Sequence, residues 1–171
     1  EAGQDYYFVA QPFLSSAAGE YFYVLAPPAP FRINKALAGA WFNEATPGQG
    51  LVIDVYDSRN TMFVAWFTFD LERPASDTAM MGESGQRWMT AQGPYEHGSV
   101  AALPMYFFGG MVFNSAVPPV EALDQQGTLM IEFDGCNTGT ASYDLVTAGR
   151  VNEFPIVPLT DNHVELCEAF T

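Results

Sequence analysis

Basic residues are scarce in this chain. Its 171 residues include 6 Lys and Arg against 20 Asp and Glu, which gives a formal net charge of -14. Nucleic-acid binding is disfavoured, because basic side chains that neutralise phosphates supply most of that affinity. An anionic membrane surface is disfavoured for the same reason. We therefore expect no nucleic-acid partner.

Long apolar runs, histidine and cysteine are also rare. No apolar run approaches the roughly 20 residues that a membrane-spanning helix needs, so we expect no membrane insertion. The two histidines, His97 and His163, show no paired spacing, and we expect exposed loop histidines with no metal site. Cys136 and Cys167 are the only cysteines. In an exported chain we expect them to form a disulfide.

The start of the chain bears on its location. It begins at Glu1 and not at Met, which indicates a removed signal peptide, with simple trimming as the alternative. Together with the cysteine pair, this predicts a secreted, periplasmic or cell-surface protein.

The composition is that of a folded domain. Hydrophobic residues make up 49% and charged residues 15%, which argues against disorder. The length allows one domain with a core. Aromatic residues make up 15%, and their large surfaces must be buried in a core, a ligand site or an interface.

Residues 39–70 give the clearest structural signal. Leu51, Ile53 and Val55 alternate with other residues, residues 62–70 alternate as well, and a polar turn at 57–60 separates the two runs. This pattern is typical of a β-hairpin. Both faces of the second run are apolar, so we expect that strand to be central and covered on both sides.

The alternation continues along the chain. Further strand-like runs are residues 86–92, 99–108, 128–134 and 140–145. Residues 154–159 also resemble a strand, which Pro155 and Pro158 would confine to a sheet edge. We predict an all-β fold of about eight to ten strands, a single antiparallel barrel or sandwich over residues 33–171.

Residues 1–32 form a separate N-terminal arm in this prediction. The arm is rich in aromatic residues and proline, and has almost no charge between residues 6 and 31. Its strands either complete the sheet or dock on a neighbouring molecule by strand addition.

Two family resemblances involve the strands. Gly39-Ala40-Trp41-Phe42 resembles the GxW[YF] start of avidins and lipocalins, the calycin barrels. That resemblance implies a tryptophan that closes one barrel end, often beside an arginine from a late strand, which would be Arg150.

The second resemblance covers more of the chain. It is to an exported proteobacterial family without an assigned function and implies export, a β fold and no nameable activity. Its pattern includes Trp41-Phe42-Asn43, Pro47-Gly48-Gln49-Gly50, Ala65-Trp66-Phe67-Thr68-Phe69-Asp70 and Gln86-Arg87-Trp88.

No catalytic or cofactor-binding motif is recognisable, so we expect a non-enzymatic protein without a cofactor. The alternative is a hydrolase that uses Asp54 and Asp57 as an acidic pair, with Glu44 close by. Arg87 is expected to pair with a carboxylate across the sheet.

The aromatic residues are the best candidates for binding. We expect Trp41 and Trp66 in the core and leave Trp88 open; if Trp66 and Trp88 share an outward face, they form a stacking platform for sugars or protein. Candidate ligand- or partner-binding residues are Trp88, Trp41, Tyr56, Tyr95, Tyr6, Tyr7, Tyr21 and Tyr23.

These residues lead to a functional expectation. The sequence favours an extracytoplasmic structural or interaction protein that contacts itself or another extracytoplasmic protein through aromatic surface and the arm. A calycin-like protein that binds a small molecule or carbohydrate is the alternative.

Overall fold

The computed structural model describes residues 7–9, 24–26, 31–71, 86–96, 98–109, 112, 114–119, 121–122 and 124–171. The chain divides into two compact units, residues 1–30 and 31–171. In the first unit, β1 (Tyr7–Val9) pairs antiparallel with β2 (Val24–Ala26). Apart from Phe31 and Arg32, the remainder of the expected arm lies outside the described residues.

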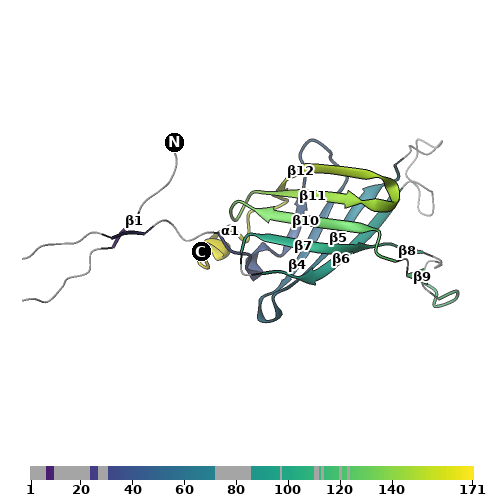
Figure 1. Cartoon of the computed structure of the whole chain (residues 1–171), viewed down its shortest axis with the longest axis horizontal. Helices are drawn as coiled ribbons and strands as arrows, with labels where there is room; N and C mark the ends of the chain where they lie inside the picture. The colour runs from purple at the N-terminus through teal and green to yellow at the C-terminus, as the bar shows by residue number, and fades with distance from the viewer. Residues whose placement is uncertain are drawn as a thin grey trace, which may run out of the picture. The chain divides into compact units, whose positions relative to one another are not determined.

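The second unit is a closed antiparallel barrel of eight strands (Figure 1). The strands are β3 (Gly39–Phe42), β4 (Gly50–Tyr56), β5 (Thr61–Phe69), β6 (Gln86–Pro94), β7 (Val100–Tyr106), β10 (Gly127–Phe133), β11 (Gly139–Leu145) and β12 (Arg150–Pro158). They pair in chain order, and β12 returns to β3. The predicted all-β fold is confirmed, with a barrel as its architecture.

The barrel closes through a short contact. Val157 lies opposite Phe42, and Pro158 lies opposite Trp41. The expectation that Pro155 and Pro158 confine this strand to an edge is therefore wrong, because β12 joins β11 to β3. Pro155 is tolerated because it lies opposite Thr140 of β11, in the part of β12 that has no partner on β3.

Alternation decides which side chains fill the barrel. The residues Leu51, Ile53 and Val55 of β4 are buried, as are Met62, Val64 and Trp66 of β5. On the opposite face of β5, Ala65 is buried but Phe67 is about half exposed, so this face is not fully covered. The prediction that β5 is covered on both sides is thus wrong: in a closed barrel, one face of each strand faces outward.

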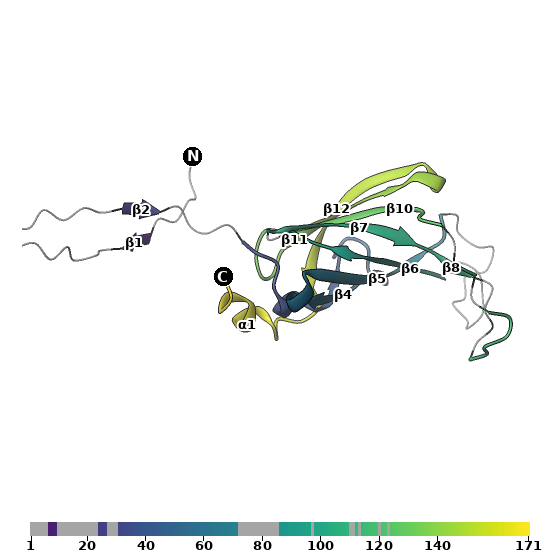
Figure 2. The same cartoon turned by 60° about the horizontal axis from the view of Figure 1, so that its bottom comes forward.

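Short elements mark the two ends of the barrel. At one end, η1 (Lys35–Leu37) precedes β3 and contacts α1 (Val164–Glu168). At the other end lie β8 (Phe108–Gly109), β9 (Glu121–Ala122) and the turn η3 (Val146–Ala148) (Figures 1 and 2). Among the described residues, no helix is both long and apolar enough to cross a membrane.

Candidate functional site

Trp41 fills the end of the barrel that η1 and α1 cover, here called the closed end. Its side chain is 1% exposed, and its indole Nε1 donates a hydrogen bond to the carbonyl oxygen of Leu37 at 2.9 Å. The ring meets Phe133 edge-on with centroids 5.2 Å apart. The expected core position of Trp41 is confirmed, and its ring fills the interior of the barrel at this end.

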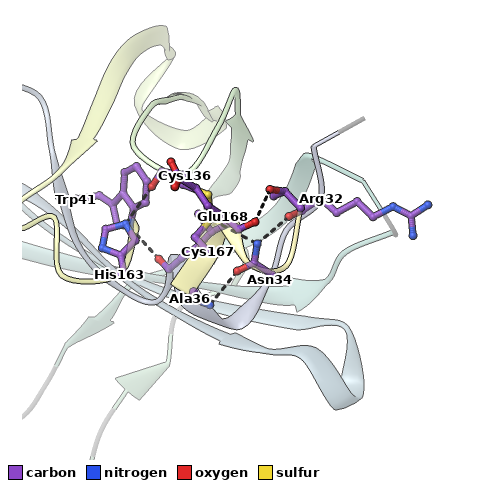
Figure 3. Close-up of a disulfide and its surroundings, with 10 residues drawn as sticks. Arg32, Asn34, Ala36, Trp41, Cys136, His163, Cys167 and Glu168 are labelled. Carbon is purple, nitrogen blue, oxygen red and sulfur yellow. Dashed lines mark hydrogen bonds between the residues drawn. A yellow bond between two sulfur atoms is a disulfide. The ribbon is translucent and has the colours of Figure 1, made fainter. Parts of the chain in front are cut away.

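A disulfide fastens α1 over the closed end (Figure 3). Cys136 and Cys167 are bonded as predicted, and Asn34 Nδ2 lies 3.5 Å from Cys167 Sγ. His163 Nε2 lies 3.0 Å from the Cys136 carbonyl oxygen, and the His163 ring is 5.7 Å from that of Trp41. His163 lies in the turn before α1, as predicted for a loop histidine, but it is half-buried in this packing and not exposed. The disulfide indicates an oxidising, extracytoplasmic environment.

Arg150 does not take the position that the calycin resemblance implies. It begins β12 and lies opposite Leu145, whereas Trp41 lies opposite Pro158 at the other end of the same strand. Arg150 is also exposed. The side chain that packs beside Trp41 is that of His163 and not that of Arg150.

Tyr95 belongs to the closed end as well. Its hydroxyl donates to Asp57 Oδ1 at 3.2 Å, while Asp57 Oδ2 accepts from the backbone N–H of Lys35 at 3.1 Å. Burial, reinforced by the Asp57 carboxylate and this hydrogen bond, raises the pKa of Tyr95 to about 12. Asp57 of the β4–β5 turn therefore joins η1 to Tyr95, which is itself buried.

The opposite, open end of the barrel contains a cavity of about 390 Å³. This volume lies near the lower end of the range for small-molecule sites, about 300–1,000 Å³. The cavity is lined by Asn43, Thr46, Gln49, Gly50, Trp66, Thr68, Phe69, Asp70, Leu71, Arg87, Met89, Phe107, Tyr143, Leu145, Ala148, Asn152 and Phe154. Its wall is mainly aromatic and aliphatic.

Three rings from different strands meet inside this cavity. Trp66 of β5 lies 5.2 Å from Tyr143 of β11 and 5.6 Å from Phe154 of β12, measured between ring centroids. The Tyr143 and Phe154 rings are 6.4 Å apart. Three strands separate β5 from β11 in either direction around the barrel, so these rings, here called the aromatic floor, cross the lumen.

The rim of the cavity is polar. The turn before β4 is shaped by Gly48, whose φ of 88° suits glycine, and by Gly50, where a Cβ would lie 2.7 Å from the Trp41 carbonyl oxygen. Between them, Gln49 Oε1 accepts a hydrogen bond from the Thr68 hydroxyl at 2.7 Å. This pair fixes one side of the rim.

An ion pair lies next to the Gln49–Thr68 pair, because Arg87 of β6 lies opposite Thr68 of β5. Arg87 Nε lies 2.8 Å from Asp70 Oδ1, and both residues line the cavity. The predicted pairing of Arg87 with a carboxylate across the sheet is confirmed. The two charges compensate each other at the entrance.

Trp66 and Trp88 lie on opposite faces of the sheet. Trp66 is 8% exposed and points inward, whereas Trp88 is 53% exposed and points outward. The core position of Trp66 is confirmed, and a platform shared by the two tryptophans is excluded. Trp88 instead lies opposite Phe67 across β5 and β6 and stacks on Phe108 at 6.4 Å between centroids. We call Phe67, Trp88 and Phe108 the outer aromatic strip.

Other candidate residues are dispersed. Tyr56 is exposed at the end of β4. Tyr7 lies in β1. The remaining arm candidates Tyr6, Tyr21 and Tyr23, and also His97, lie outside the described residues.

The acidic pair is not part of the cavity. Asp57 follows β4 at the closed end, whereas Glu44 lies in the turn before β4, so the expected proximity of Glu44 is wrong. Asp54 is exposed on the outside of β4. Among the described residues, no three His, Cys, Asp or Glu side chains are placed to hold a metal ion.

The sequence interpretation missed the cavity residues Tyr143, Phe154 and Met89 as a site. A signal was present, because Tyr143 shares the inward face of Ala141 and Leu145 in the predicted alternation. An inward-facing aromatic residue near the end of a strand can either fill the barrel or line a cavity. Which of the two occurs depends on the residues of the opposite wall. That information is absent from a local pattern.

No protein-family model, curated protein or solved structure matches this chain. Both family resemblances therefore stay predictions, and the functional argument depends on the cavity.

Proposed function

We propose that this protein binds a small, largely apolar molecule in the cavity at the open end of its barrel. The observation that carries the proposal is a cavity of about 390 Å³ whose floor consists of the aromatic residues Trp66, Tyr143 and Phe154. Pre-formed concave sites with apolar walls and a few polar groups are typical of small-molecule binding.

The arrangement of the two ends supports this proposal. Trp41 fills the closed end, so a ligand would enter at the open end, where Asn43, Gln49 and Asn152 line the cavity. The GxW[YF] start and the tryptophan that fills one barrel end are the features that the calycin resemblance implies. We therefore favour the calycin-like alternative over an acidic-pair hydrolase.

The test uses two fluorescent apolar probes, the uncharged two-ring naphthalene dye prodan and the long-chain parinarate. We expect saturable binding of at least one. Ala148→Trp should abolish binding because Ala148 lines the cavity. Val146→Trp is the matched control, because Val146 lies in the same turn and is absent from the cavity wall. Failure of both probes to bind, or equal binding by the two variants, would contradict the proposal.

A second candidate function is protein–protein contact through the outer aromatic strip. Phe67 and Trp88 are 50% and 53% exposed, and half-exposed aromatic side chains are enriched at interfaces. A second copy of the chain is the first partner to test. Light scattering coupled to size exclusion should give a dimer that Trp88→Ser dissociates; a monomer at high concentration would leave this candidate without support.

A further inference from the structure

The cavity is shallow, because the aromatic floor crosses the barrel. Trp66 reaches from β5 to Tyr143 on the opposite wall, with 5.2 Å between their centroids. The next inward residues toward the closed end on these three strands are fully buried: Val64, Ala141 and Ile156. A long alkyl chain would have to displace the floor to pass, whereas a short ligand can lie on it.

The floor favours a planar aromatic ring. Its three rings are tilted by 42° to 56° with centroids 5.2 to 6.4 Å apart. Aromatic rings pair best in offset or edge-to-face geometry at about 4.5–7 Å, so an added ring can extend the cluster at the same spacing. A sugar would have to bury hydroxyl groups against this apolar wall, which is costly without hydrogen-bond partners.

The charges at the rim favour an uncharged molecule. Among the described residues that line the cavity, Arg87 is the basic one, and its Nε lies 2.8 Å from Asp70 Oδ1. An anionic ligand would have to compete with Asp70, and the chain's net charge of -14 would oppose its approach. The neutral amides of Asn43 and Asn152 line the cavity and can bind a polar substituent.

We infer that the ligand is a small, uncharged, planar aromatic molecule of one or two rings, which lies on Trp66, Tyr143 and Phe154 with its polar substituent toward the rim. This inference rests on the proposed function and narrows it to one ligand class. The cavity volume of about 390 Å³ sets the size limit.

Calorimetric titration of the full chain with four probes tests the inference. The probes are naphthol, the anion naphthalenesulfonate, the neutral long-chain decanol, and methyl glucoside. We expect naphthol to bind at least about tenfold more tightly than each of the other three. Trp66→Leu and Tyr143→Leu should each weaken naphthol binding about tenfold, and Trp88→Leu on the outer face should change it less than about twofold.

Each outcome bears on a distinct claim. If decanol, naphthalenesulfonate or the glucoside binds as tightly as naphthol and Trp66→Leu weakens it, the ligand class is wrong and the cavity function stands. If naphthol binding depends on Trp88 and not on Trp66 or Tyr143, the site is wrong. If none of the four binds, both the inference and the proposed function fail. Tyr143→Leu keeps the test valid should Trp66→Leu not fold.

Discussion

Trp66 and Tyr143 stand on opposite walls of the barrel, yet their ring centroids are only 5.2 Å apart. This contact divides the lumen into two parts. Toward the closed end the interior is filled, with Ala101, Ile131 and Phe133 fully buried. Toward the open end it leaves the cavity. One long-range contact thus separates a packed core at one end of the barrel from a cavity at the other.

Replacement of Trp66 should destabilise the fold. We expect Trp66→Leu to lower the free energy of unfolding by about 2–4 kcal/mol, because a buried indole that contacts two rings is lost. Trp88→Leu is the matched control and should cost less than about 1 kcal/mol, since Trp88 is half exposed. Urea unfolding measures both. Equal losses of unfolding free energy in the two variants would contradict the assignment of Trp66 to the inward face and Trp88 to the outward face.

Removal of the disulfide should destabilise the closed end. Cys136 and Cys167 are 31 residues apart in the sequence, and in the entropy model such a cross-link contributes about 3–4 kcal/mol. We expect the double variant Cys136→Ala, Cys167→Ala to lose stability of this size in urea unfolding. The wild-type protein should lose a similar amount under a reductant, and the variant should not respond to it. If the reductant does not change the unfolding free energy of the wild-type protein, the prediction is contradicted.

Tyr95 should ionise at a higher pH than an ordinary tyrosine. Its pKa is raised from the ordinary tyrosine value of 10.0 to about 12, chiefly by burial. The fold therefore favours the neutral phenol, and this contribution to stability is complete below pH 10.0 and is lost as the pH rises through about 12. Absorbance titration of tyrosinate should show a phase near pH 12 that Tyr95→Phe removes. A titration unchanged by this substitution would contradict the assignment.

The local structure was predictable where alternation was strong. Leu51, Ile53 and Val55 share the inward face that their spacing predicts. In β5, however, the sequence shows only which residues share a face. Because Trp66 and Phe67 are both aromatic, the pattern does not decide which of them points inward. That choice is set by Tyr143 and Phe154, which are distant in the sequence.

The closure of the barrel and the cavity were not predictable from local patterns. Pro158 lies opposite Trp41, and this long-range pairing turns the predicted edge strand into the seam of the barrel. The disulfide was predictable because an exported chain with two cysteines has a single intramolecular pairing. The packing of His163 on Trp41 follows from that disulfide and α1, and the sequence around His163 contains no sign of it.

Methyl NMR of the methionines tests the central claim most directly. Met89 lines the cavity, Met62 lies buried away from its wall, and Met130 is exposed on the outside. Titration with naphthol should shift the Met89 methyl resonance through the ring current of the bound probe and leave those of Met62 and Met130 unchanged. A saturating titration in which Met89 does not move, or in which Met130 moves instead, would contradict a binding site inside the open end of the barrel.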